Sequence, residues 1–388
     1  KLQEVTHEFA DADRGAVITG TGLEEDGHEG TEKADSVLNL ILITGNIGKP
    51  GTGMNIFRGL NNQQGANDMG SRPHTLPGYL SVTDDEALEE VERVWGSKPP
   101  QEPGLSELEA IQEFGDTVQG AFVFGENPAV SKMSDDDVNR RFESLDFLVV
   151  QDIFETETTQ YADVVLPGSA WAEKSGTVTN LDRQVQMMRP SSQPPGKARE
   201  DLSILTEIGG RLSNLNFDYD GPQEVFDEMT GVNPLYAGMS YEGIGDGGQR
   251  WPFPEGANKG VKILHKERFM TGRKRAPLRT VTGTDKEEKG DGLVLITERR
   301  ASELNSSTVT GRSDIPNTTQ ERGVLHVNPQ DAEERGIRES DTVVVEKEGS
   351  SIKTKVRITS GVRQGVVYLD PKTAESLAGE GRVQVRVP

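Results

Sequence analysis

The sequence contains no cysteine, and this absence excludes several kinds of site at once. Without cysteine the chain can form no disulfide and can offer no thiolate to zinc or to an iron-sulfur cluster. The five histidines show no spacing typical of a metal site. There is also no apolar run of about 18 residues, so we expect no membrane span. We therefore expect no metal ligand in this chain, and any cluster must be held elsewhere.

Aromatic residues are scarce, at 5%, and acidic residues far outnumber basic ones. The 64 Asp and Glu against 42 Lys and Arg give a net charge of −22, spread along the whole chain. Such a surface argues against nucleic acid or an anionic membrane as a partner. It is typical of proteins kept soluble in concentrated salt, although an ordinary acidic cytosolic protein is the alternative.

The usual targeting and nucleotide-binding signals are missing as well. The N-terminus has no charged-then-apolar signal pattern, which favours a cytoplasmic location. The first residue is Lys1 rather than Met, which suggests that an upstream portion belongs with this chain. No G-x-G-x-x-G follows a strand, and neither a P-loop nor a G-x-S-x-G elbow is present. A bound nucleotide must therefore be gripped in another way.

The 388 residues predict two or three domains. Apolar runs at 16–19, 121–124, 147–150 and 163–166 alternate with helical patterns, which predicts α/β architecture with parallel sheets covered on both faces. The stretch 217–290 is rich in Gly and Pro and is expected to be an irregular wrapping segment. The last hundred residues contain six short strand patterns, typical of a small β-barrel.

Polar residues follow the predicted parallel strands, where ligands of open α/β sheets bind. Asn127 comes shortly after the run 121–124, and Asp152 directly after the run 147–150. An amide beside a carboxylate suits the hydrogen-bonding edge of guanine, whose ring and amino groups are donors. The alternative is that both residues only cap the helices that follow.

The loop FRGLNNQQGANDMG, residues 57–70, places one cation, Arg58, among amides and glycines. Glycine permits close backbone approach to a ligand, and the planar guanidinium matches a small carboxylate or other oxyanion. The alternative is a polar loop in which Arg58 forms a surface ion pair.

Five motifs occur in a fixed order: TGNIGKPGTGMN, FRGLNNQQGANDMG, FGENP, VVQDIFETETTQYADVVLP and EKSGTVTNLDRQVQ. With these motifs the chain resembles the molybdopterin-guanine-dinucleotide oxidoreductases of the dimethyl-sulfoxide-reductase superfamily, and within them the catalytic (alpha) subunits of formate dehydrogenases. The motifs cover residues 18–212, and a weaker similarity continues through LHKERF to the C-terminal strands.

The resemblance implies a formate-oxidising enzyme that uses bis(molybdopterin guanine dinucleotide) with molybdenum or tungsten. It implies that Arg58 orients the substrate carboxylate and that Leu60, Asn61 and Gln63 face substrate or pterin. The cofactor-binding positions that it implies are Thr21, Glu25, Lys49, Gly125, Glu126, Asn127, Gln151, Asp152, Lys174, Asp201, Thr297, Arg299, Arg300, Asn305 and Ser306.

The resemblance also implies a division of the chain. Residues 1–60 would end an α/β pterin-binding domain, 61–175 would form a parallel-sheet guanine-dinucleotide domain, and 176–290 would connect and wrap. Residues 291–388 would form a C-terminal double-psi β-barrel closing over the cofactor. The implied partners are an N-terminal iron-sulfur half or companion subunit, electron-transfer subunits, and formate as substrate.

Departures from the family pattern leave two alternatives open. Leu60 stands where the family has Gln, and Thr21 and Glu25 stand where it has Met and Gln. The barrel loop reads ERRASELNSST instead of carrying Trp and His, and the asparagine-containing segment expected between Tyr368 and Pro388 is missing. The family's iron-sulfur cysteines and the metal-ligating cysteine or selenocysteine with its histidine lie upstream. The alternatives are a related reductase for nitrate or another oxyanion, and a non-catalytic scaffold subunit of an electron-transfer complex.

Overall fold

The computed structural model describes residues 1–23, 28–131, 140–213, 215–282, 292–297, 308–312, 323–347, 349–374, 377 and 381–388. The chain divides into two compact units, each built from two stretches of sequence. The first unit comprises Lys1–Glu109 and Pro167–Thr284, and the second comprises Ala110–Leu166 and Asp285–Pro388. The chain therefore leaves the first unit and returns to it before the C-terminal barrel begins.

The first unit begins with a helix and a small parallel sheet. Its first stretch contains α1 (Leu2–Asp11), β1 (Ala16–Gly20), η1 (Thr21–Leu23), α2 (His28–Ile43), β2 (Gly53–Phe57), α3 (Gln63–Asp68), β3 (Thr75–Leu76), η2 (Pro77–Tyr79), β4 (Leu80–Ser81) and α4 (Asp85–Trp95). Its second stretch contains η4 (Trp171–Glu173), β8 (Gly176–Thr179), β9 (Gln184–Met188), α8 (Asp201–Leu212), α9 (Pro222–Val232), α10 (Tyr241–Ile244) and β10 (Gln249–Arg250).

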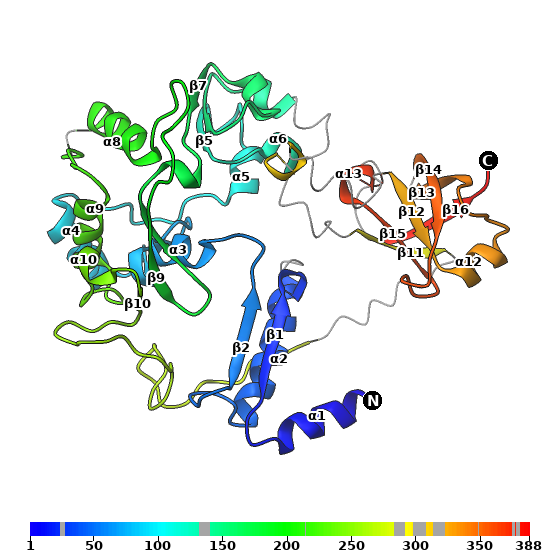
Figure 1. Ribbon diagram of the computed structural model, residues 1–388, viewed down its shortest axis with the longest axis horizontal. Helices are drawn as coiled ribbons and strands as arrows, with labels where there is room; N and C mark the ends of the chain where they lie inside the picture. The colour runs from blue at the N-terminus through cyan, green and yellow to red at the C-terminus, as the bar shows by residue number, and fades with distance from the viewer. Residues whose placement is uncertain are drawn as a thin grey trace. The chain divides into compact units, whose positions relative to one another are not determined.

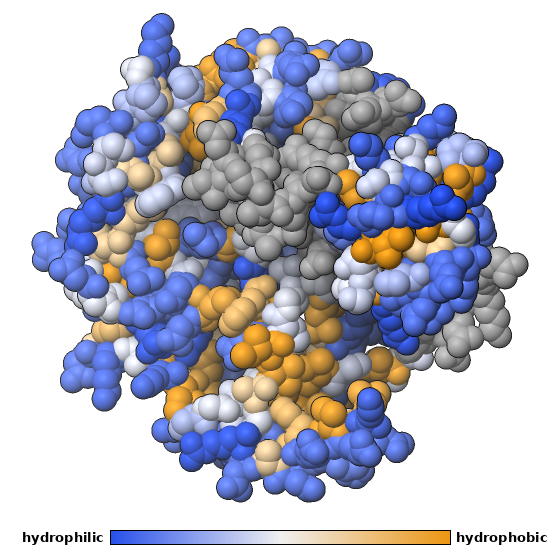
Figure 2. Space-filling model, turned by 45° about the vertical axis from the view of Figure 1, so that its right-hand side comes forward, coloured by the Kyte–Doolittle hydropathy of each residue, from blue (hydrophilic) through white to orange (hydrophobic). Residues whose placement is uncertain are grey.

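Strands β1 and β2 pair in parallel, and α2 packs against β2. The opposite face of this pair exposes apolar side chains, because Ile18 is 63% and Phe57 is 56% exposed. Apolar surface is correspondingly visible in the lower part of Figure 2, where Figure 1 places β1 and β2. The predicted strand at 16–19 is thus confirmed, while the predicted cover on both sheet faces is not found at this pair in the described chain.

The stretch 217–290 was predicted to be irregular, and this prediction is wrong for its first half. Helices α9 and α10 form there and contribute Phe226, Met229 and Ile244 to a buried cluster that also holds Tyr236 and Trp251. Pro222 at the first turn of α9 was an available signal, since proline is favoured at that position. The stretch was predicted to be irregular because it is rich in Gly and Pro, although its few apolar residues have helical spacing.

The second unit joins a small α/β sheet to a barrel. Its first stretch contains the second half of α5 (Glu107–Gln112), then β5 (Gly120–Phe124), α6 (Pro128–Ser131), β6 (Phe147–Asp152), η3 (Thr158–Tyr161) and all but the last residue of β7 (Val164–Pro167). Its second stretch contains β11 (Leu293–Thr297), η5 (Thr310–Arg312), β12 (Val324–Val327), α12 (Pro329–Glu334), β13 (Thr342–Lys347), β14 (Ser350–Ile358), β15 (Val366–Leu369), α13 (Pro371–Ala374) and β16 (Gly381–Arg386).

The sheet has the strand order β5-β6-β7, and β5 pairs with β6 in parallel. Leu148 and Val150 of β6 are buried in a cluster with Phe142, which covers one face. Phe122 and Phe124 on the other face of β5 are 40% and 43% exposed, so the predicted cover on both faces is not found here either. An apolar strand pattern predicts burial but does not identify what provides the cover.

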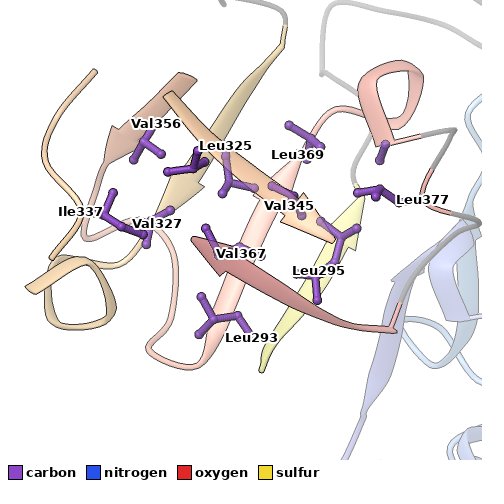
Figure 3. Packing of buried hydrophobic residues seen from close by; sticks show 14 of the residues in the cluster. Leu293, Leu295, Leu325, Val327, Ile337, Val345, Val356, Val367, Leu369 and Leu377 are labelled. Carbon is purple, nitrogen blue, oxygen red and sulfur yellow. The ribbon is translucent and has the colours of Figure 1, made fainter. Parts of the chain in front are cut away.

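The barrel is closed, with the strand order β11-β15-β12-β14-β13-β16. Its core is aliphatic: Leu295, Leu325, Val345, Val367 and Leu369 are each 0% exposed, and their side chains gather between the strands (Figure 3). All six strand patterns of the sequence form strands, because alternate residues face the interior of a small barrel. The mixed α/β class with parallel sheets and a closed barrel is confirmed.

Candidate functional site

The Arg58 loop leaves β2 and enters the short helix α3. Arg58 is half-buried and follows the last residue of β2, while Leu60 is 46% exposed. Asn61 is exposed and Gln63 half-buried, and both flank Asn62, whose φ of 61° lies in the left-handed region. The four residues predicted to face substrate or pterin are thus presented on one continuous turn.

This turn is fixed on strand β8. The side-chain oxygen Oδ1 of Asn62 accepts a hydrogen bond of 2.9 Å from the backbone N–H of Thr179. Gly65 lies so close to this contact that a Cβ there would come within 2.1 Å of Asn62 Oδ1. Glycine at position 65 therefore permits the close approach of α3 to β8, and this approach fixes the position of the Arg58 loop.

Lys174 and Asp201, predicted separately as cofactor-binding residues, are brought together. The ammonium group of Lys174 donates to Asp201 Oδ2, and both side chains are partly buried. Asp201 is the first residue of α8, where a carboxylate also interacts favourably with the helix dipole. The pair can keep the lysine in place for an anionic ligand.

Thr21 and Lys49 lie near the β1–β2 pair. Thr21 begins η1 directly after β1, and Lys49 is exposed in the loop between α2 and β2. Buried Asn46 anchors that loop, because its Oδ1 accepts a 2.8 Å hydrogen bond from Gly15 N–H. The loop therefore presents Lys49 from a fixed base.

The second unit gathers the predicted nucleotide residues at the ends of β5 and β6. Gly125, with a φ of 63°, turns the chain after β5, and its N–H donates to Gln151 O at 2.8 Å. Glu126 is exposed, whereas Asn127 and Gln151 are 3% and 1% exposed. The structure thus brings together the residues that the sequence placed after two separate strands.

Asp152 uses one of its carboxylate oxygens within the turn that follows β6. Its Oδ1 accepts from the N–H groups of Ile153 and Phe154, at 2.7 and 3.2 Å. Among the described residues no hydrogen bond reaches Oδ2. Burial raises the pKa of the Asp152 carboxyl, while the two backbone hydrogen bonds and the charge of Arg312 oppose this shift. The side chain therefore shapes its own turn with one oxygen and offers the other to a donor.

Asn127 does more than cap α6. Its Oδ1 accepts from the backbone N–H and the hydroxyl of Thr158, at 3.1 and 2.7 Å, and its Nδ2 donates to Glu157 and Thr308. Its backbone oxygen accepts from Val130 and Ser131 at the start of the helix. The side chain thus ties together the segments around the strand ends.

Thr308 and Arg312 are residues of this site that sequence reasoning missed. Thr308 Oγ1 accepts from Asn127 Nδ2 at 3.0 Å. The Arg312 guanidinium lies over the ring of Phe154, 4.8 Å from its centroid, and donates to the backbone oxygens of Thr308 and Glu155. No local pattern marks this contact, which joins positions more than 150 residues apart in sequence.

Five of the predicted cofactor residues lie outside the described residues. They are Glu25, Arg299, Arg300, Asn305 and Ser306. Thr297, the last residue of β11, is half-buried. The described part of the predicted barrel loop is thus limited to its first residue.

Comparison with known proteins identifies the family. The molybdopterin oxidoreductase family matches residues 3–211, and the molybdopterin dinucleotide binding domain matches residues 293–383. These ranges contain both the strand-end site of Asn127 and Asp152 and the barrel. The chain therefore belongs to the molybdopterin oxidoreductase family, and the class of cofactor that we predicted from the motifs is confirmed.

Individual relatives extend this result. The chain is 37% identical to the "F420-dependent formate dehydrogenase 2 subunit alpha" of Methanococcus maripaludis, over 95% of this chain and 55% of that protein. It is 38% identical to the "F420-dependent formate dehydrogenase subunit alpha" of Methanocaldococcus jannaschii, over 93% of this chain and 54% of that protein. The chain thus spans about half the length of the curated relatives it matches.

A solved structure agrees in fold. Acetylene hydratase from Pelobacter acetylenicus superimposes with a TM-score of 0.51 at 16% identity, covering 73% of this chain and 42% of that one. At this identity the likeness shows the fold alone. None of the helices described here is long and apolar enough to cross a membrane.

Proposed function

We propose that this chain is the cofactor-holding part of a molybdenum- or tungsten-dependent formate dehydrogenase. The observation that carries the proposal is the sequence identity of 37–38% to two formate dehydrogenase alpha subunits along more than nine-tenths of the chain. The family match at residues 3–211 includes the Arg58 loop, and a hydrogen bond from Thr179 to Asn62 attaches this loop to β8. The bound metal-pterin group would accept the electrons that leave formate.

In this proposal Arg58 binds the substrate carboxylate. Its planar, permanently charged guanidinium can offer two parallel N–H groups to the two oxygens of formate. Leu60, exposed two residues further on, is apolar and can add no hydrogen bond to that carboxylate. Arg58 therefore carries the binding of the charge, and Asn61 beside it provides amide contacts.

The second unit is proposed to hold the guanine end of the dinucleotide. Asp152 Oδ2 would accept from the N–H groups of guanine, while buried Gln151 and Asn127 shape the surrounding strand ends. The barrel is proposed to be a double-psi barrel, a finer assignment supported by its two parallel pairs, β11–β15 and β12–β14. The division at 1–60, 61–175, 176–290 and 291–388 is proposed as a division of cofactor roles.

The partners are also part of the proposal. Because the chain contains no cysteine, the iron-sulfur clusters that conduct electrons away must be held by an N-terminal half or a companion subunit. Electron-transfer subunits would follow, and the assembly would work in the cytoplasm. In this arrangement the chain supplies the substrate arginine and the nucleotide grip.

The test begins with the protein purified from its source together with its partners. Metal content per chain and formate oxidation with an artificial electron acceptor are measured on this material. We expect about one molybdenum or tungsten and several irons per chain, with formate oxidised. Arg58→Ala is expected to lower kcat/KM for formate at least about a hundredfold, as the loss of a key charge-stabilising donor does, while cofactor stays bound.

A matched control separates substrate binding from general charge loss. Arg72 is an exposed arginine whose Nε donates to Asn67 Oδ1, and Arg72→Ala should leave turnover intact. Full activity in Arg58→Ala would remove Arg58 from the substrate site. Reduction of nitrate without oxidation of formate would favour the oxyanion reductase, and a complex without molybdenum or tungsten would favour the scaffold.

A further inference from the structure

A fully buried carboxylate lies ten residues after Arg58, at the end of α3. Asp68 is 0% exposed, and among the described residues no Lys or Arg forms an ion pair with it. Burying a carboxylate is unfavourable unless hydrogen bonds replace those that it made to water. Burial raises the pKa of Asp68, and its hydrogen bonds oppose that shift.

Three neutral donors surround this carboxylate. Gln64 Nε2 and the Tyr79 hydroxyl donate to Oδ1, each at 2.8 Å, and the Tyr236 hydroxyl donates to Oδ2 at 2.7 Å. The backbone oxygen of Asp68 also accepts from Asn233 Nδ2 at 2.9 Å. The donors come from α3 itself, from η2 and from the segment after α9. Asp68 thus links α3 to nearby η2 and to the segment after α9, which is 168 residues away at Tyr236.

These contacts close a ring that contains α3. The Tyr236 hydroxyl is 3.0 Å from the hydroxyl of Thr179, and the backbone N–H of the same Thr179 donates to Asn62 Oδ1. Asn62 caps the first end of α3 and Asp68 forms its last residue. Both ends of the helix are therefore tied to a single residue of β8, one end directly and the other through Tyr236.

Apolar packing does not hold this helix in place. Its only buried residues are Gly65 and Asp68, and it is six residues long. A helix of this length has no stability of its own in water. Its position must therefore come from hydrogen bonds, and among these the ring ties both of its ends to β8. The Arg58 loop enters the helix at the ring member Asn62.

We infer that Asp68 is a positioning residue for the Arg58 loop, acting through Tyr236 and Thr179 to fix the helix from which Arg58 and Asn61 are presented. This inference rests on the proposed function, because it assigns Asp68 a role in binding formate without contacting it. Displacing a substrate-binding arginine by about 1 Å can lower the rate of the enzyme roughly a hundredfold. A ring of hydrogen bonds that holds the Arg58 loop in place can therefore control activity without contacting the substrate.

The two tyrosines provide a discriminating pair. Both hydroxyls donate to Asp68, but only Tyr236 belongs to the ring, whereas Tyr79 donates from outside it. In the native complex, Tyr236→Phe is expected to lower kcat/KM for formate about fivefold or more, as the loss of a net hydrogen bond does. Tyr79→Phe should stay within about twofold, because Gln64 still donates to the same carboxylate oxygen.

Substitutions of Asp68 itself test the inference directly. Asp68→Ala opens the ring and is expected to lower kcat/KM about a hundredfold with cofactor content unchanged. Asp68→Asn keeps the shape: its amide can donate to the Tyr236 hydroxyl, which then donates to Thr179. That variant should retain activity within a few-fold of the wild type.

Hydrogen exchange of residues 57–67 provides a readout that is independent of activity. Asp331 offers a matched control, because it is a buried Asp of the barrel whose Oδ2 accepts from Gly365 N–H at 2.7 Å. We expect Asp68→Ala to speed exchange in 57–67 and Asp331→Ala to leave that segment unchanged. If Asp68→Ala fails to fold, kcat/KM for formate and hydrogen exchange of residues 57–67 are measured on Tyr236→Phe instead, and these two results test the inference.

Three results would overturn the inference. They are equal kinetic effects of the two tyrosine substitutions, unchanged exchange in 57–67, and exchange that rises uniformly along the chain. A wild-type complex that oxidises no formate would instead overturn the proposed function. In that case the exchange pattern alone would still decide whether Asp68 holds the loop.

Discussion

The loop between α2 and β2 permits a prediction whose magnitude can be worked out from two glycines. Gly48 has a φ of +73°, and a Cβ built there would lie 2.5 Å from the backbone oxygen of His265 and 3.3 Å from Lys266 Cα. Both obstacles are backbone atoms, so the clash is not relieved by rotating a side chain. Gly48→Ala must therefore shift the segment around His265 or the loop that presents Lys49.

The expected cost has two parts. Placing alanine in the left-handed region costs about 1–2 kcal/mol, and overpacking typically adds about 1–3 kcal/mol. We thus expect Gly48→Ala to lower the free energy of unfolding by about 2–5 kcal/mol. Gly51 in the same loop has a φ of +74° and nothing within 4 Å of its built Cβ. Gly51→Ala should therefore cost only the conformational part, about 1–2 kcal/mol.

Urea unfolding followed by tryptophan fluorescence measures this difference. The chain's three tryptophans, Trp95, Trp171 and Trp251, all belong to the first unit, so their emission reports on the unit that contains the loop. The difference between the two variants isolates the contact with His265. Equal costs for Gly48→Ala and Gly51→Ala would refute the reasoning, because they would show that the segment at His265 yields without penalty.

Three further predictions concern single side chains. Asp152→Ala is expected to reduce guanine nucleotide released from the denatured complex at least about tenfold, through loss of charge-assisted hydrogen bonds; unchanged nucleotide content would show that Asp152 only shapes its turn. Leu295 is 0% exposed in the barrel core, and Leu295→Ala is expected to lower the free energy of unfolding of the barrel by about 2–5 kcal/mol, measured by circular dichroism. The unfolding transition followed by tryptophan fluorescence should not move, because all three tryptophans belong to the first unit. A shift of that transition would show that the two units do not unfold independently. For Asp68 the folded-state pKa lies above its ordinary value of 3.8, so its stabilising contribution is complete below that pH and is lost as pH rises through the folded-state pKa. The free energy of unfolding of the wild type, taken relative to Asp68→Asn, should therefore fall as the pH rises above about 4. A constant difference would show that burial does not perturb this carboxyl.

Local patterns in the sequence were sufficient for the six barrel strands and for the order of the motifs, but not for α9 and α10. Short apolar runs bounded by turn residues indicate the barrel strands, and in most of these strands burial alternates from residue to residue, as a small barrel requires. The positions of Asn127 and Asp152 after two apolar runs also placed both at one sheet edge, because parallel strands end on the same side. These conclusions depend on neighbours in sequence and on repeating geometry, which a linear pattern contains.

The tertiary structure alone decided which distant residues meet. The hydrogen bond from Tyr236 to Asp68 spans 168 residues, and that from Asn127 to Thr308 spans 181. The pairing of Lys174 with Asp201 likewise turned two separately predicted ligands into partners. No periodicity encodes such contacts, because they depend on the path that the chain takes between the segments. For this reason the loop of Arg58 was predictable from sequence, whereas the buried ring that positions it was not.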